Sequence, residues 1–193
     1  MAPLTIGLTG GIAAGKSEAL AAFSRLGGAT LSSDAVAHEL LDSEPLIGRL
    51  VERWGPEVAP EGRVDRNRIG ELVFADPDQL SWLEQQIHPL VGERIGAWLV
   101  NLPAPTEIAV IEVPLLFESG MEGAFDTTLA IVTADEVRRE RAAARGHALV
   151  DEREARQLAQ DEKADRAEHT VRNDGSVADL ERALSALIEK LRR

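Results

Sequence analysis

The chain has 193 residues, 44% of them hydrophobic and 28% charged, which suits one globular domain or one domain with a sizeable insertion. A formal net charge of −12 at pH 7 argues against a broad surface for nucleic acid or acidic membranes, and the absence of cysteine excludes disulfides and thiolate metal sites. The longest apolar stretch, around Ile108–Phe117, is broken by Glu112 and Pro114, so no membrane span is predicted. These features predict a cytoplasmic protein. They do not give the oligomeric state, for which a monomer is favoured.

The first predicted strand, Leu4–Thr9, runs into a glycine-rich loop and then into a helix over Ser17–Leu26. Residues 10–17 match the phosphate-binding pattern G-x-x-x-x-G-K-S, and we call them the phosphate loop. Glycines there let backbone N–H groups close around phosphate oxygens at the positive end of the helix. Lys16 would contact the β- and γ-phosphates, and the Ser17 hydroxyl would bind Mg²⁺. The pattern predicts a nucleoside triphosphate site made of Gly11, Ile12, Ala13, Ala14, Gly15, Lys16, Ser17 and Glu18.

A short second strand over Ala29–Leu31 precedes a helix from about Asp34 to Leu41. The carboxyl ends of neighbouring parallel strands share one crevice, so Asp34 is expected there. Its carboxylate could accept a proton from an attacking hydroxyl group and help to hold Mg²⁺. Asp34, or Ser33 before it, could equally cap the helix that follows, and the position alone leaves both roles open.

Residues 42–105 lack strand signals and are predicted to form helices punctuated by proline and glycine, as a helical insertion in a nucleotide-binding core. His88 and Pro89 interrupt the helical pattern from Gln79 to Leu99. Because proline disfavours helix for the residue before it, a kink or break is expected there. A lone histidine beside a proline is more often a local hydrogen-bonding device than a catalyst.

The rest of the chain alternates short apolar runs with helical patterns, which is typical of βαβ units and a parallel sheet. The predicted strands are Thr106–Val113, Thr127–Val132 and Thr170–Val171, and the predicted helices are Ala134–Arg145, Asp151–Lys163 and Val177–Leu191. Glu112, near the end of the third strand, could hold water on Mg²⁺ or pair with an arginine. The expected fold class is α/β, a P-loop NTPase fold with a five-stranded parallel sheet flanked by helices.

Arg138, Arg141 and Arg145 are spaced i, i+3, i+7 and fall on one face of a predicted helix. Guanidinium groups stabilise the charge on a transferring phosphoryl group, although a solvated face paired with Glu140 would have the same spacing. The position after a strand and before a glycine-containing connection favours a lid over a nucleotide.

The phosphate loop indicates the phosphoryl donor but not the acceptor. The D-x-x-G and N-K-x-D motifs of GTPase switches and the G-x-G-x-x-G motif of dinucleotide-binding proteins are all missing from the sequence. A small-molecule kinase is therefore favoured over a switch module that binds ATP without phosphorylating a small molecule.

These segments together resemble the dephospho-coenzyme A kinase family along nearly the whole chain. The residues that carry the resemblance are Thr9-Gly10-Gly11-Ile12, Asp34-Ala35 with Leu40, Asp65-Arg66 followed by Val73-Phe74, Ile87-His88-Pro89-Leu90, Val113-Pro114-Leu115-Leu116-Phe117-Glu118, Arg141 and Arg145, Gln157 with Glu162-Lys163, and Asn173-Asp174-Gly175. Ser32 stands where the family usually has an aspartate, and Glu18 where it usually has a threonine.

The resemblance implies ATP-dependent phosphorylation of the ribose 3′-hydroxyl of dephospho-coenzyme A, with Mg²⁺ as cofactor. It implies that Asp34 is the catalytic base and a metal ligand with Ser17, and that Lys16 and Arg141 stabilise the transferring group. Arg145 would also contact the nucleotide, and Asn173 would lie against adenine. The implied acceptor contacts are Thr9, Asp34, Arg66, His88, Pro114, Leu115, Leu116 and Glu118.

The same resemblance implies a nucleotide-binding core over residues 1–41, 106–133 and 164–193. An acceptor-binding helical insertion over residues 42–105 and a helical lid over residues 134–163 complete the chain. A different small-molecule kinase, of the nucleoside monophosphate or shikimate type, is the principal alternative, followed by the non-catalytic ATP-binding switch.

Overall fold

The structure is a computed structural model, and it describes residues 2–144 and 157–192. Contacts within the chain divide it into two compact units, residues 1–32 with 102–193 and residues 33–101. Each unit is described by itself. Among the described residues, no helix combines the length and apolar character needed to cross a membrane.

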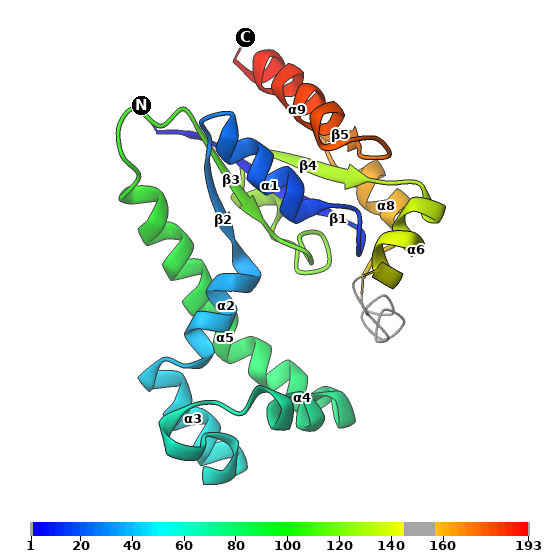
Figure 1. The fold of residues 1–193 in the computed structure, drawn as a ribbon. Coiled ribbons are helices and arrows are strands. Elements are labelled where there is room, and N and C mark those ends of the chain that lie inside the picture. Colours follow the sequence, from blue (N-terminus) through cyan, green and yellow to red (C-terminus); the bar gives the residue numbers. More distant parts are fainter. Residues whose placement is uncertain (1, 145–156, 193) are drawn as a thin grey trace. The chain divides into compact units, whose positions relative to one another are not determined.

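The first unit contains a five-stranded, wholly parallel sheet in the order β2-β3-β1-β4-β5 (Figure 1). Its strands are β1 (Leu4–Gly10), β2 (Ala29–Ser32), β3 (Ile108–Glu112), β4 (Thr127–Val132) and β5 (His169–Arg172). Strands β3 and β4 are buried along their whole length, as expected for a parallel sheet covered on both faces. Glu112 is in register with Leu8 of β1 and Ser32 of β2, so these residues share the carboxyl edge of the sheet. The predicted five-stranded parallel sheet is confirmed.

Helices flank this sheet, and two of them share its main apolar core. The helices of the unit are α1 (Lys16–Arg25), the short η3 (Glu122–Ala124), α6 (Asp135–Ala144), α8 (Gln160–Arg166) and α9 (Val177–Leu191). Phe23 of α1 and Leu184 of α9 are fully buried against Ile6, Leu129 and Ile131 of the sheet. Helix α9 keeps its predicted bounds because its apolar residues follow the helical period, and Ser176 with Asp179 forms a capping box at its start.

The helix predicted over Asp151–Lys163 is confirmed at residues 160–163 and wrong at residues 157–159. Residues 151–156 lie outside the described residues, and residues 157–159 are not helical. Helix α8 begins only at Gln160, after an extended Ala159, and ends at Arg166. The amide of Leu158 instead donates to the Glu118 carboxylate at 2.8 Å, so a distant partner replaces the local helical bond.

The second unit is entirely helical in the residues described. It contains α2 (Ser33–Leu41), α3 (Glu44–Trp54), the short η1 (Pro56–Val58) and η2 (Pro60–Gly62), α4 (Arg66–Ala75) and α5 (Pro77–Val100). The strand-free character expected for residues 42–105 therefore holds between residues 42 and 101.

The expected interruption at His88-Pro89 is not a break, because α5 continues through Pro89. An interior proline removes one helical hydrogen bond and costs about 3 kcal/mol. The opposing contribution comes from packing, since Leu83, Ile87, Val91 and Ile95 recur every four residues and are all buried, and α5 packs on α2 and α4. Burial of each such side chain contributes about 1.5–3 kcal/mol. The four buried side chains together therefore stabilise the helix by more than the proline costs.

The exposed carboxylate of Asp126 joins the entries of β1 and β4. It accepts hydrogen bonds from the Thr5 amide and the Thr5 hydroxyl, both at 2.8 Å, and the Asp126 amide donates to the Thr5 hydroxyl at 3.0 Å. These bonds from Thr5 to the ionised form lower the pKa of Asp126 below its ordinary value. Their contribution to stability is therefore present above the unfolded pKa of about 3.9 and is lost as the pH falls through the lower folded pKa.

We expect Asp126→Asn to lower the free energy of unfolding by about 1 kcal/mol at pH 7, a modest value because the group is exposed. Urea unfolding of both proteins between pH 7 and pH 3.5 measures this difference. It should stay constant down to about pH 5 and shrink below about pH 4, where the unfolded chain takes up a proton at Asp126 that the folded protein does not yet bind. Asp165→Asn on α8 controls for the loss of one exposed charge. A difference that does not vary with pH would contradict the assignment.

Candidate active site

The phosphate loop has the strained backbone that its glycines allow. β1 ends at Gly10 and α1 begins at Lys16. Gly10 has φ 152° and Gly15 has φ 94°, both in the region that favours glycine. A Cβ atom at Gly10 would collide with the Ile131 carbonyl, and one at Gly15 with the Asn173 amide. Glycine is therefore required at both positions, and the loop leads into the positive end of α1 as a phosphate site does.

Lys16 and Ser17 occupy the first turn of α1. The Lys16 ammonium donates to the carbonyls of Gly10 and Gly11, at 3.0 Å each, so the cation is held against the loop itself. The Ser17 side chain is exposed and available to a ligand. One cation and one hydroxyl group thus lie at the N-terminal end of α1, where the helix dipole is positive. This arrangement favours a bound polyanion.

Two residues that follow neighbouring strands donate hydrogen bonds to the backbone of the phosphate loop. The Ala14 carbonyl accepts a hydrogen bond from the Thr133 hydroxyl and another from the Asn173 side-chain amide, both at 2.9 Å. Thr133 follows β4 and Asn173 follows β5, and both are buried. The contact expected between Asn173 and adenine stays a prediction, whereas its amide already supports the loop. Thr133 was missed, although a polar residue directly after a buried strand is a signal for this edge of the sheet.

Two arginines of α6 turn toward the phosphate loop. Arg141 donates to the Asn173 carbonyl at 3.0 Å, and Arg138 pairs with Asp135 at 3.3 Å. The Arg138 side chain is only 22% exposed, and a Cβ atom at Gly11 would lie 3.4 Å from its Nη1. A purely solvated face therefore does not describe these two side chains. Arg138 was not among the predicted contacts, and the predicted contact Arg145 lies outside the described residues.

A cleft of about 530 Å³ opens beside the loop within the first unit. Its lining comes from the tip of the loop, the start of α6, the segment entering α8, and Arg172 of β5. Gln160 closes one wall, because its side chain accepts from the Thr133 amide at 2.8 Å and donates to the Thr133 carbonyl at 2.9 Å. The volume lies within the range of small-molecule and cofactor sites.

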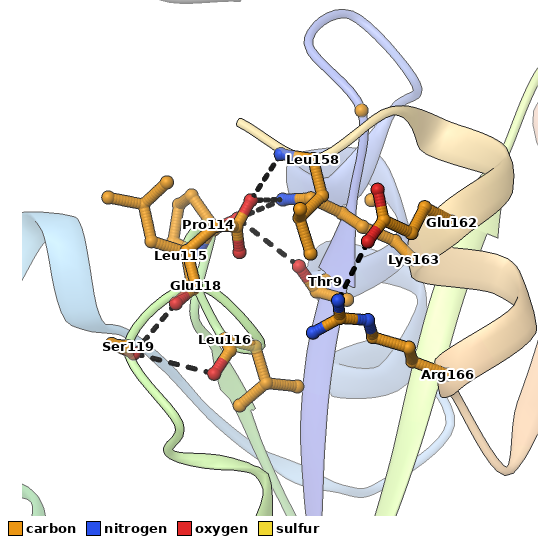
Figure 2. Close-up of polar contacts among 12 residues, drawn as sticks. Thr9, Pro114, Leu115, Leu116, Glu118, Ser119, Leu158, Glu162, Lys163 and Arg166 are labelled. Carbon is orange, nitrogen blue, oxygen red and sulfur yellow. Dashed lines mark hydrogen bonds and ion pairs between the residues drawn. The ribbon is translucent and has the colours of Figure 1, made fainter. Parts of the chain in front are cut away.

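The loop after β3 is tied to the end of β1 and to α8 (Figure 2). The Thr9 hydroxyl, which is fully buried, donates to the Pro114 carbonyl at 3.3 Å. The Lys163 ammonium donates to the same carbonyl and forms an ion pair with Glu118 at 3.0 Å. Leu116 is fully buried, and Pro114 and Leu115 are half-buried. Glu118 and Thr9 thus have partners inside the protein, and Lys163 was missing from the predicted site.

The remaining predicted contacts lie in the second unit. Asp34 is exposed in the first turn of α2, just after the buried Ser33. Arg66, half-exposed at the start of α4, donates to the His38 carbonyl at 3.1 Å and pairs with Asp42 at 3.0 Å. His88 is exposed on α5. The structure therefore brings together the loop, the arginines and the residues after β3, β4 and β5 in one unit, and places Asp34, Arg66 and His88 in the other.

Comparison with known proteins decides the family. The family model for dephospho-CoA kinase matches residues 4–179, which is most of the chain. The chain belongs to the dephospho-CoA kinase family. A dephospho-CoA kinase of Thermus thermophilus is 38% identical over 192 residues, covering 98% of this chain and 92% of that one.

Two solved structures have the same fold as this chain. A crystal structure from Thermus thermophilus is 37% identical, covers 99% of both chains and superposes with a TM-score of 0.83. Dephospho-CoA kinase from Campylobacter jejuni is 26% identical, with a TM-score of 0.71 and coverage of 97% of this chain and 96% of that one. The expected kinase family and its P-loop fold are both confirmed.

Proposed function

We propose that this chain transfers the γ-phosphoryl group of ATP to the ribose 3′-hydroxyl of dephospho-coenzyme A, giving coenzyme A and ADP. One observation carries the proposal: a phosphate loop held in a strained shape by Thr133 and Asn173, with two arginines turned toward it, in a chain of the dephospho-CoA kinase family. The loop supports ATP as donor, and the family supports the acceptor. We further propose that the protein acts as a cytoplasmic monomer without nucleic-acid or membrane partners.

The chemistry is carried by positioning and by fixed charge. Lys16 exchanges its bonds to the Gly10 and Gly11 carbonyls for bonds to phosphate oxygens, and Arg141 adds a second cation to the transferring group. The Asp34 carboxylate accepts the proton of the 3′-hydroxyl group as that oxygen attacks. Alignment of the two substrates supplies about 7–11 kcal/mol of the barrier reduction, which is typical of well-oriented reactions.

Mg²⁺ suits the oxygen donors that this chain offers. Ser17 presents an exposed hydroxyl group beside the loop, and Glu112 is a buried carboxylate, 8% exposed, at the carboxyl edge of the sheet. We propose Ser17 and Asp34 as the ligands, with Glu112 holding water on the ion, since Mg²⁺ prefers few protein oxygens together with phosphates and water. The bound ion would neutralise charge on the β- and γ-phosphates.

The remaining roles follow the family pattern. We propose that Arg145 and Asn173 contact the nucleotide along with the loop. The proposed acceptor contacts are Thr9, Arg66, His88, Pro114, Leu115, Leu116 and Glu118.

The test is ADP formation from ATP with Mg²⁺ and one acceptor at a time. We expect kcat/KM with dephospho-coenzyme A to exceed that with AMP, CMP or shikimate by at least about 10⁴, the discrimination that a site hydrogen-bonded to its substrate achieves. Mass spectrometry should show one phosphate added to the acceptor. Preference for AMP, CMP or shikimate would indicate a different small-molecule kinase, and ATP binding without phosphorylation of any of these acceptors would favour the ATP-binding switch.

A further inference from the structure

Lys163 is a charged residue without any exposed surface, and the reaction outlined above does not use it. Its ammonium has two acceptors, the Pro114 carbonyl and the Glu118 carboxylate, the latter at 3.0 Å. Burial lowers the pKa of Lys163, and the hydrogen bond to Glu118 opposes that shift only in part. Because a buried ion pair is often less stabilising than apolar side chains of similar size, stability alone gives no reason for this pair.

Both partners of Lys163 lie in the loop after β3, and each of them also accepts a hydrogen bond from another segment of the first unit (Figure 2). The Pro114 carbonyl also accepts from Thr9, the last residue before the phosphate loop, at 3.3 Å. One oxygen of Glu118, Oε1, also accepts the Leu158 amide, which lies in the segment entering α8, at 2.8 Å. A single ammonium and a single carboxylate therefore join the end of β1, the loop after β3 and the entry to α8.

The Glu118 carboxylate is held through one oxygen. Its Oε1 atom receives both Lys163 and Leu158, whereas Oε2 is buried and no donor among the described residues reaches it. The Glu118 side chain is 15% exposed. Loss of Lys163 would leave a buried carboxylate with a single amide donor and would release the Pro114 carbonyl to Thr9 alone, so the whole turn would lose its fixed position.

We propose that Lys163 is a positioning residue for the acceptor. It fixes the Pro114–Glu118 loop relative to Thr9 and the phosphate loop, and the acceptor hydroxyl is thereby aligned with the γ-phosphate. This inference rests on the proposed function, in which that loop contacts the acceptor. Lys163 acts through Pro114 and Glu118, and a small displacement of such a loop is enough to cost about 10²-fold in rate.

Two variants separate positioning from support of the fold. Lys163→Met removes the cation but keeps a long side chain, and leaves Glu118 as a buried charge, so it should lower the thermal midpoint. The double variant Lys163→Met with Glu118→Leu removes both charges and should recover most of that midpoint. The matched control is Arg166→Gln, which breaks an exposed ion pair with Glu162, 2.7 Å long, on the same helix.

The measurements are kcat, the separate KM values for the two substrates, and the dissociation constant of a non-hydrolysable ATP analogue. In both Lys163 variants we expect kcat/KM for dephospho-coenzyme A to fall by about 10²-fold while affinity for the analogue stays within about twofold. Arg166→Gln should match wild type in all of them. If Lys163→Met does not fold, Lys163→Gln, which removes the charge and leaves Glu118 in place, is measured in its stead.

The proposal is overturned if the double variant keeps wild-type kcat/KM for the acceptor, or if affinities for acceptor and analogue fall together. Failure of the proposed function would look different. In that case the wild-type protein itself would not phosphorylate dephospho-coenzyme A, and the variants would be compared on whichever acceptor it does use.

Discussion

Replacing Lys16 with alanine should lower kcat by about 10²–10³ or more, the loss seen when one preorganised donor to a transition-state charge is removed. The ammonium is held against the Gly10 and Gly11 carbonyls at 3.0 Å, at the start of α1, so its truncation removes the cation that the loop itself carries. Loss of these two bonds also relaxes the loop, and affinity for ATP should therefore fall together with kcat. Steady-state kinetics with dephospho-coenzyme A and binding of a non-hydrolysable ATP analogue measure the two effects.

Lys190→Ala is the matched control, since Lys190 lies on an exposed part of the last turn of α9. It should retain wild-type kinetics. The thermal midpoint of Lys16→Ala should stay close to that of wild type, because the side chain supports a loop and not the apolar core. Full activity in Lys16→Ala would be incompatible with the phosphate loop as donor site.

Asp34→Asn should lower kcat by about 10²–10⁴ while affinity for the ATP analogue changes little, because the amide keeps the shape of the side chain but cannot accept the proton of the acceptor hydroxyl. Asp34 is exposed in the first turn of α2, so its replacement leaves no buried group without a partner and should not unfold the protein. The readouts are kcat against pH, KM for each substrate and the thermal midpoint.

Glu39→Gln removes one exposed charge from the same helix and serves as the control; it should behave as wild type apart from its ion pair with Arg94, 3.8 Å long. Wild-type turnover in Asp34→Asn would remove the assignment of a base. An unchanged kcat with a raised KM for the acceptor would instead give Asp34 a binding role.

Much of the fold was predictable from local patterns. The phosphate loop, β4 and α9 were found at or within one residue of their bounds because their signals lie between residues that are near neighbours in sequence. The turn from β1 into α1 depends on glycines only a few positions apart. The same holds for α6, where a spacing of three residues is enough to predict that Arg138 and Arg141 share one helix face.

The errors arose where distant contacts override local preference. Helix α5 continues through Pro89 because four buried side chains outweigh one missing hydrogen bond. Helix α8 starts late because the Leu158 amide bonds to Glu118, forty residues away. Neither effect can be read from a short window of sequence.

The site shows the same division. The sequence predicts Lys16, Ser17 and the loop glycines as site residues because the expected chemistry depends on their spacing along one turn. The hydrogen bonds that support the loop could not be predicted in this way. Thr133 and Asn173, which donate to the Ala14 carbonyl, lie 119 and 159 residues from it in the sequence. The Lys163–Glu118 pair likewise forms only when α8 packs against the sheet near the loop that follows β3. Local geometry follows from neighbouring residues, whereas the partners of a buried polar group are set by how the sheet and its helices close around it.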